Sequence, residues 1–347
     1  EAINKNHRKI NEKKVVIDNN MSAFICNNSF HSKYVYYIFR ELNMNDFLNI
    51  SAVPSINMDL LKSSRFSITH NTQNQQKMAY FLDAKTSEID QTIEKDKELI
   101  ELLKEKRTAL INHVVTKGLD PNVKMKESGI DWIGKIPEGW EVRKLKHATD
   151  TKISNVDKKI NPNEPEIELC NYTDVYYNEY ITSNLKFMKA TCTYEQKNKF
   201  SLQKGDVMIT KDSELPEDIA VPAVSKENFE DVVCGYHLSF IRPFKNKIFG
   251  EYLMRLLQSR TVNTQFVISA LGVTRFGIST YPIKNSHILI PPKHEQSDII
   301  KYLDKETSKI DETIKKIEEK ISLMEEYKKS LIHHVVTGKV DVRGVSI

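Results

Sequence analysis

The sequence predicts a mixed α/β fold. Domains of twisted β-sheet with short helices are joined to two long helices, which pair as an antiparallel coiled coil with pseudo-two-fold symmetry. The chain has 347 residues, a length that fits two or more domains. A block of 36 residues occurs twice, and each copy has the composition of a long helix. Aromatic-rich segments at 168–172 and 232–243 have the composition of strands.

The duplication is the strongest feature of the chain. Residues 81–116 and 302–337 are identical at 19 of 36 positions without a gap. The likeness continues weakly upstream, where 32–39 matches 250–257 as a short amphipathic helix. Residues 1–72 are therefore predicted to be the second half of a domain whose complete version lies at 140–292. The start of the first copy is expected to be missing.

Each repeat has the apolar spacing of a coiled coil. Proline is absent from both copies, and Gly118 and Gly338 stand where helices end. The predicted seam consists of Ile89, Ile93, Ile100, Leu103 and Leu110 in the first copy, and of Ile310, Ile314, Ile321, Met324 and Leu331 in the second. We expect the two helices to pair with each other, which would place the flanking domains at opposite ends. Asp96, Arg107 and Lys328 interrupt the seam, and they either fix its register or are tolerated near exposed ends.

The segment between the first repeat and the complete domain is rich in turn signals. Trp132 lies in it, and Trp140, the other tryptophan of the chain, follows it as the first residue of the complete domain. They are expected to dock onto a neighbouring surface or a partner. The predicted division of the chain is a partial domain at 1–72, a long helix at 73–117, a linker at 118–139, a complete domain at 140–292, a second long helix at 293–337 and a tail at 338–347.

Three motifs together resemble the specificity subunit of type I restriction–modification systems. They are the repeated helix ending in His-x-Val-Thr, Ser-Gly-Ile-x-Trp-Ile-Gly-x-Ile-Pro-x-x-Trp-x-Val at 128–142, and Ile-Pro-Pro-x-x-Glu-Gln at 290–296. The resemblance covers the chain from about 23 to 344. It implies two target-recognition domains, each reading one half of a bipartite site in double-stranded DNA. It also implies that 1–72 is the second half of the first of them.

The resemblance further implies a non-catalytic DNA-binding subunit that serves defence against foreign DNA. Such a subunit recruits two adenine-N6 methyltransferase subunits, which carry out DNA methylation, and then ATP-driven translocase–endonuclease subunits. Its coiled coil sets the gap between the half-sites. The missing start of the first recognition domain is the departure from this pattern.

Loops of the complete domain supply the first candidate DNA contacts. Lys211 and Ser213 follow a predicted strand at 207–210, and they are expected to reach a phosphate or a guanine. Thr274 and Arg275 lie between Gly272 and Gly277 in a loop after a helix and before a predicted strand at 281–290. An arginine between two glycines is expected to reach and contact the edge of a base. The alternative for the Lys211 loop is a solvated turn, and the alternative for Arg275 is an intradomain salt bridge.

Weaker candidates complete the predicted interface. Tyr236 and His237 head another strand, where they either contact a base or fill the core. Lys199 is a candidate phosphate contact or an ordinary surface residue. In the first copy, Ser55 and Asn57 lie where the Arg275 loop would be.

The sequence lacks the motifs of ATP hydrolysis and adenine methylation. The sequence has neither a phosphate-binding GxxxxGK loop nor the Asn/Asp-Pro-Pro-aromatic motif of adenine methyltransferases. No cofactor, metal site or membrane span is therefore expected, and the four scattered cysteines favour a reducing cytoplasmic setting. A net charge of only +4 argues against non-specific nucleic-acid binding and favours local patches. The alternatives are a stand-alone nuclease and a structural coiled-coil scaffold.

Overall fold

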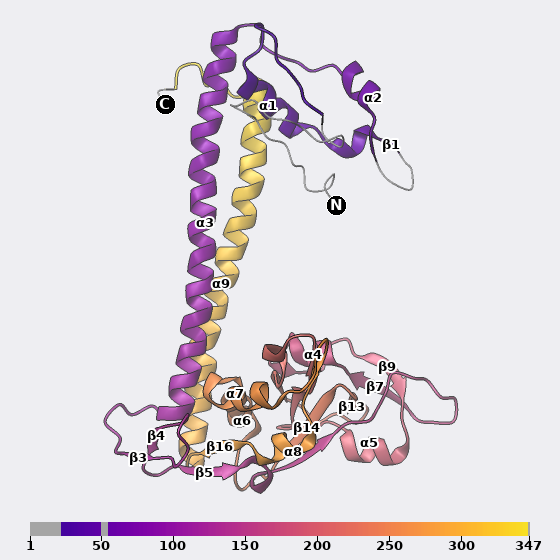
Figure 1. Cartoon of the computed structure of the whole chain (residues 1–347), viewed down its shortest axis with the longest axis vertical. Coiled ribbons are helices and arrows are strands. Elements are labelled where there is room, and N and C mark those ends of the chain that lie inside the picture. Colours follow the sequence, from indigo (N-terminus) through magenta and orange to yellow (C-terminus); the bar gives the residue numbers. More distant parts are fainter. Residues whose placement is uncertain (1–21, 50–54, 346–347) are drawn as a thin grey trace. The chain divides into compact units, whose positions relative to one another are not determined.

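The computed structural model describes residues 22–49 and 55–345, and they form two compact units. The first unit is Glu1–Glu101 with Thr313–Ile347, and the second is Leu102–Glu312. The fold is mixed α/β, as predicted. Two long helices, α3 (Thr72–Lys117) and α9 (Lys293–Val336), contribute residues to both units (Figure 1). No helix of the described part is long and apolar enough to cross a membrane.

The two long helices run antiparallel, which confirms the predicted pairing. In the first unit, Asp90 pairs with Lys328 and Asp96 pairs with Lys320, so the numbering rises on one helix as it falls on the other. Gly118 and Gly338 follow the helix ends with φ of 80° and 72°, a conformation that glycine adopts without strain.

The predicted seam faces inward between the helices. Ile89, Ile93, Ile100 and Ile310 are buried. The other predicted seam residues, Leu103, Leu110, Ile314, Ile321, Met324 and Leu331, are half-buried. Burial of this stripe supplies the main attraction between the helices, because each buried aliphatic side chain contributes about 1.5–3 kcal/mol.

The charged interruptions of the seam form ion pairs between the helices. Arg107 pairs with Asp311 at 2.8 Å, and Lys328 pairs with Asp90. Each member of the first pair is the repeat counterpart of a member of the second, so the pseudo-two-fold symmetry of the sequence is present in the contacts. The aspartate of each pair is at least half exposed, and pairs of this kind stabilise by only about 0.2–1 kcal/mol, so their main effect is on register.

The first unit also contains several short elements. They are α1 (Ser32–Glu41), a 3-10 turn (Met44–Phe47), β1 (Leu48–Asn49), β2 (Ser55–Ile56) and α2 (Met58–Ser63). Tyr34 and Tyr37 of α1 are buried against Leu82 of α3 and Val335 of α9. Among the described residues, this unit contains only the two-stranded pair β1–β2, so the twisted sheet expected of the first domain is not found there.

The second unit contains the larger sheets. A five-stranded sheet has the order β6-β14-β10-β12-β8 and is antiparallel except where β12 meets β8. A three-stranded sheet has the order β13-β7-β9. The strands of these sheets are β6 (Thr149–Ile153), β7 (Glu166–Cys170), β8 (Tyr180–Ile181), β9 (Met188–Thr191), β10 (Val207–Thr210), β12 (Pro222–Ser225), β13 (Val232–Cys234) and β14 (Leu238–Pro243).

Two-stranded pairs and short helices complete this unit. The pairs join β3 (Met125–Glu127) to β4 (Lys135–Pro137), β5 (Glu141–Lys144) to β16 (His287–Ile290), and β11 (Asp212–Ser213) to β15 (Phe276–Gly277). The helices are α4 (Tyr172–Tyr176), α5 (Tyr194–Phe200), α6 (Gly250–Gln258), α7 (Arg260–Ser269) and α8 (Thr280–Asn285), with 3-10 turns at Leu145–His147 and Pro216–Asp218. One large core joins α6, α7 and both long helices.

Three strand predictions were wrong in their extent. The segment 232–243 is two strands in different sheets, broken at Gly235, where a side-chain Cβ would lie 2.9 Å from the carbonyl oxygen of Cys170. The strand predicted at 168–172 ends at Cys170, and Tyr172 begins α4. Residues 280–285 form α8 instead of a strand, because Pro282 falls in the first turn, where a helix tolerates proline.

The two tryptophans, Trp132 and Trp140, have different surroundings. Trp140 is fully buried, and its indole N–H donates to Glu295 Oε2 at 2.8 Å. It packs in the core of the second unit, so it is a docking residue within the chain. Trp132 is 56% exposed and meets only the edge of the His287 ring, with 6.2 Å between ring centroids.

Candidate nucleic-acid interface

Three loops of the second unit meet at one place. The first connects β10 to β11 through Lys211, the second connects β13 to β14 through Tyr236 and His237, and the third leads from α7 to β15. The backbone fastens them together, because Lys211 N–H donates to His237 O at 3.1 Å and Lys211 O accepts from Ile278 at 2.8 Å. The pairing of β11 with β15 fixes the third loop beside the first.

Asp212 is the centre of this cluster. Its carboxylate receives Arg275 at 2.6 Å and lies 2.7 Å and 2.9 Å from Nδ1 of His237. Lys211 Nζ lies 3.3 Å from the same group. Five residues predicted as DNA contacts from separate segments of the sequence are thus adjacent in space: Lys211, Ser213, Tyr236, His237 and Arg275. We call Lys211, Asp212, Ser213, Tyr236, His237 and Arg275 the Asp212 cluster.

The electrostatics of the cluster favour an ionised Asp212. Burial raises the pKa of this carboxyl, but the hydrogen bonds from His237 and Arg275 outweigh it, and the pKa lies below its ordinary value. The cluster is therefore a half-buried anion in contact with two cationic side chains, Lys211 and Arg275, and with the imidazole of His237. The Arg275 side chain is 58% exposed, although it forms the intradomain ion pair that was the alternative to DNA contact. One nitrogen of the Arg275 guanidinium donates to Asp212, and the other nitrogens can donate to a further acceptor.

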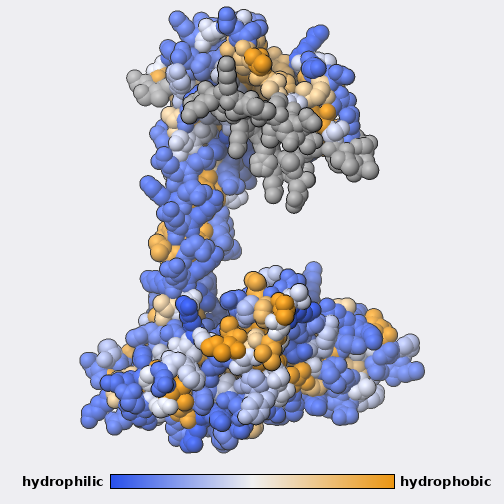
Figure 2. Space-filling model, viewed as in Figure 1, coloured by the Kyte–Doolittle hydropathy of each residue, from blue (hydrophilic) through white to orange (hydrophobic). Residues whose placement is uncertain are grey.

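The loop that carries Arg275 is a tight hairpin. Leu271 and Gly277 exchange two backbone hydrogen bonds of 2.9 Å, and Gly272 has a φ of 151°. A Cβ on Gly272 would lie 1.9 Å from the carbonyl oxygen of Arg275, so only glycine fits. Val273 is 91% exposed and Thr274 is exposed beside it. The visible face of the second unit carries apolar patches among hydrophilic residues (Figure 2).

An aromatic group borders the cluster, and the sequence analysis missed it. Tyr172 Oη donates to Ser213 Oγ at 3.3 Å, and its ring stacks on Tyr176 with 5.4 Å between centroids. Tyr177 meets Tyr176 edge-on and is 76% exposed. The run 172–180 contains four tyrosines, a signal of aromatic interleaving that was available in the sequence.

Three predicted contacts lie outside the Asp212 cluster. Lys199 is exposed on α5, where its ammonium lies 5.4 Å from the centroid of the Phe200 ring. Ser55 and Asn57 belong to the first unit: Ser55 accepts from Asn49 at 3.3 Å, and Asn57 caps α2 by accepting from Leu60 N–H at 3.0 Å. Val53 and Pro54 of the same predicted loop lie outside the described residues.

The described residues contain no group of three or more histidine, cysteine, aspartate or glutamate side chains arranged to hold a metal ion. The histidines near the helix ends have local partners: His333 lies 3.2 Å from Glu41, and His334 contacts Ser330. What the Asp212 cluster offers is a set of cations, hydroxyls and aromatic rings on a rigid frame. This is the chemistry of a surface that recognises nucleic acid.

Known proteins resemble the chain in sequence and in fold. Residues 137–323 match the family described as type I restriction modification DNA specificity domain. A putative type I restriction enzyme MjaX specificity subunit of Methanocaldococcus jannaschii is 28% identical over 210 residues, which are 60% of this chain and 48% of the relative. The MjaVIII specificity subunit of the same organism is 23% identical over 263 residues, 75% of this chain and 59% of the relative.

A solved structure supports the fold alone. It comes from a study of complex assembly and conformational transition of the type I R-M system, and it superposes with a TM-score of 0.64 at 13% identity. The match covers 89% of this chain and 71% of that one. The chain spans about half the length of the curated relatives it matches.

Proposed function

The chain belongs to the family of type I restriction modification DNA specificity domains, and from this membership we propose that it is the non-catalytic specificity subunit of a type I restriction–modification complex. It reads double-stranded DNA with residues 140–292. The Asp212 cluster is the observation that carries the proposal. Loops from three parts of the second unit bring cations, hydroxyls and aromatic rings onto one surface, beside a rigid hairpin.

The roles within the cluster follow from exposure and pairing. Arg275 reads a base edge, since a guanidinium with free donors can form a bidentate contact with guanine worth about 1–3 kcal/mol. Lys211 contacts phosphate, and Tyr177 offers an exposed ring for a base. Ser213 is only 8% exposed and accepts from Tyr172, so it positions that ring. Asp212 touches no DNA and positions the cations.

The duplication supports a bipartite target. We propose that the first unit belongs to a second reader, in which Ser55 and Asn57 occupy the place of the Arg275 hairpin. The paired helices α3 and α9 form a spacer of fixed register between the readers. Two methyltransferase subunits and the translocase–endonuclease subunits are the proposed partners, and the exposed Trp132 is a candidate contact for them.

The target itself is best found by single-molecule sequencing of methylated adenines in the host. The proposal expects a split motif, with two short half-sites separated by a fixed gap. Purified chain incubated with magnesium and that DNA is expected to leave it intact, and cleavage without partners would favour a nuclease instead.

Replacing Arg275 with alanine is expected to weaken binding to the split motif by about 10- to 100-fold, because the lost base contact is worth about 1–3 kcal/mol. Binding to random DNA should change little. Fluorescence anisotropy of the assembled methyltransferase complex on both DNAs measures the two affinities. Arg260→Ala, an exposed arginine outside the cluster, is the matched control. Equal losses on the two DNAs would make Arg275 a phosphate contact.

Replacing Asp212 with asparagine is expected to weaken specific binding as much as Arg275→Ala does. The variant removes the charge that holds Lys211 and Arg275 beside His237, so the two cations repel each other and lose their orientation. Asp231→Asn, which breaks the exposed pair with Lys197, is the control and should bind normally. The same anisotropy assay measures the affinity for the split motif. Normal specific binding by Asp212→Asn would show that Asp212 does not position the other residues of the cluster.

A further inference from the structure

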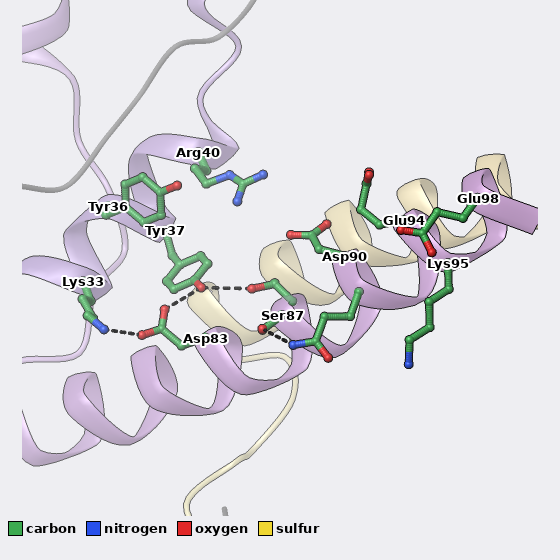
Figure 3. A pocket seen from close by; sticks show the side chains of 12 residues that line it. Lys33, Tyr36, Tyr37, Arg40, Asp83, Ser87, Asp90, Glu94, Lys95 and Glu98 are labelled. Carbon is green, nitrogen blue, oxygen red and sulfur yellow. Dashed lines mark hydrogen bonds and ion pairs between the residues drawn. The ribbon is translucent and has the colours of Figure 1, made fainter. Parts of the chain in front are cut away.

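The pocket between α1 and α3 in the first unit uses its polar groups internally (Figure 3). Tyr37 Oη donates to Asp83 at 2.7 Å and contacts Thr86 at 3.2 Å, while Lys33 pairs with Asp83. These contacts join α1 to α3. The hairpin that carries Arg275 in the second unit differs from this pocket, because it presents exposed apolar side chains.

Three large aliphatic side chains within six residues are exposed at this hairpin. Ile268 is 77% exposed, Leu271 is 80% exposed and Val273 is 91% exposed. Single exposed aliphatic residues are ordinary on protein surfaces, but several of them together mark a surface that a partner covers. The hairpin is therefore a contact surface, and its chemistry calls for an apolar group in the partner.

The backbone fixes the tip of the hairpin to the frame of the Asp212 cluster. Leu271 and Gly277 exchange two hydrogen bonds, Ile278 N–H donates to Lys211 O at 2.8 Å, and β15 pairs with β11. Val273 and Arg275 are consequently presented together, and whatever binds the guanidinium of Arg275 also lies beside Val273.

The charge around the hairpin indicates the class of partner. Residues 252–294 contain no aspartate or glutamate, although 47 of the 347 residues of the chain are acidic. The Arg275 side chain is 58% exposed within this stretch. A surface without carboxylates and with an exposed cation favours a partner rich in phosphate, so the apolar tip faces DNA.

One apolar group distinguishes the bases in the major groove of DNA. The base edges there present hydrogen-bond donors and acceptors, and thymine adds its 5-methyl group. The guanine contact proposed for Arg275 is in the same groove. Val273 and Arg275 are two residues apart, a separation of at most about 7 Å along the backbone, which equals the rise of about two base pairs.

We propose that Val273, with Leu271 beside it, reads the 5-methyl group of a thymine in the major groove, within about two base pairs of the guanine that Arg275 contacts. This inference rests on the proposed function and adds the identity of a base to it. Arg275 recognises its base by hydrogen bonds, whereas Val273 recognises its base by burying a methyl group. The hairpin thus reads two neighbouring positions by two different chemistries.

Deoxyuridine tests the contact, because it pairs as thymidine does and lacks only the methyl group. Each thymine of the two half-sites is replaced in turn, and fluorescence anisotropy of the assembled methyltransferase complex measures the affinity. At the thymine that Val273 reads, we expect the replacement to weaken binding about fourfold, which corresponds to one buried methyl group. Uracil in the gap between the half-sites is the DNA control and should leave the affinity unchanged.

Val273→Ser is expected to bind the unmodified motif about fourfold more weakly than the wild-type chain, and to bind the thymine and uracil DNAs equally, because the apolar contact is lost. Val273→Ile should keep the preference for thymine. Ile160→Ser is the protein control: it replaces a 69% exposed isoleucine elsewhere in the second unit and should discriminate as the wild-type chain does.

Several outcomes would overturn the methyl contact. If the wild-type complex prefers the split motif but tolerates uracil at every thymine, the contact is absent while the proposed function stands. If Val273→Ser still prefers thymine to uracil, another residue reads the methyl group. If Val273→Ser prevents the methyltransferase subunits from assembling without DNA, the tip of the hairpin faces a protein. A wild-type complex that binds the split motif no better than random DNA would overturn the proposed function as well.

Discussion

Replacing Arg255 with alanine is expected to destabilise the second unit by about 3–5 kcal/mol, because removal of one partner from a buried ion-pair network leaves uncompensated charges. Arg255 is 1% exposed. Its guanidinium donates to Glu179 at 2.8 Å and to Asp304 at 2.9 Å. Arg107 of α3 donates to Glu179 as well, so the network joins α3, α6, α9 and the edge of β8 within one unit.

Denaturant unfolding followed by tryptophan fluorescence measures this effect. Both tryptophans lie in the second unit, and the fully buried Trp140 reports on its core. Arg143→Ala is a suitable control: it breaks an ion pair with Glu141 in which the two side chains are 57% and 60% exposed, and it should cost less. If Arg255→Ala lowers the free energy of unfolding by less than about 1 kcal/mol, the network contributes no more to stability than surface ion pairs do.

The same network predicts the direction of a pH effect. Burial raises the pKa of Glu179, but Arg255 and Arg107 outweigh it, and the pKa lies below its ordinary value of 4.5. A carboxyl with a lowered folded-state pKa stabilises the fold above its ordinary pKa, and this contribution falls as the pH drops through the folded value. The difference in stability between the wild-type chain and Arg255→Ala should therefore shrink in acid.

The long helices were the most predictable part of the fold. Their apolar spacing, the absence of proline and the glycines at their ends are local signals, and a helix forms its backbone hydrogen bonds within its own segment. The duplication also predicted the antiparallel pairing. The role of Arg107 and Lys328 could not be predicted, because the effect of a charged residue on helix pairing depends on the residue that lies opposite it on the partner helix.

The strands were predicted less well, since a strand is completed by partners far away in the sequence. Residues 232–243 have continuous β-propensity, yet the chain changes sheets at Gly235 because the backbone of Cys170 passes close by. No sequence pattern within residues 232–243 indicates that the backbone of Cys170 comes close to Gly235.

The candidate site was predicted residue by residue but not as an arrangement. Lys211, His237 and Arg275 were chosen from separate loops for their chemistry. Asp212, which lies between two of the predicted residues in the sequence, joins all three. The tyrosines at 172–177 were missed because their run overlaps a segment that was assigned to a strand.

For the proposed bipartite target, lengthening both long helices by one heptad is expected to widen the gap between the half-sites by about three base pairs. Seven residues add about 10.5 Å to a helix, and DNA rises about 3.4 Å per base pair. The insertions belong after residue 101 and after residue 316, because Asp96 pairs with Lys320 and Arg107 with Asp311 on either side. A heptad keeps the seam facing its partner, although the helices rotate by about 20°.

Adenine methylation mapped in cells that carry the lengthened chain measures the gap. The half-sites should stay the same, since the Asp212 cluster lies far from the insertions in sequence. An insertion in α9 alone is the control, because it shifts Asp311 away from Arg107 and should reduce methylation at every site. An unchanged gap with both helices lengthened would mean that another part of the complex measures the distance, and the paired helices would then serve only to join the two units.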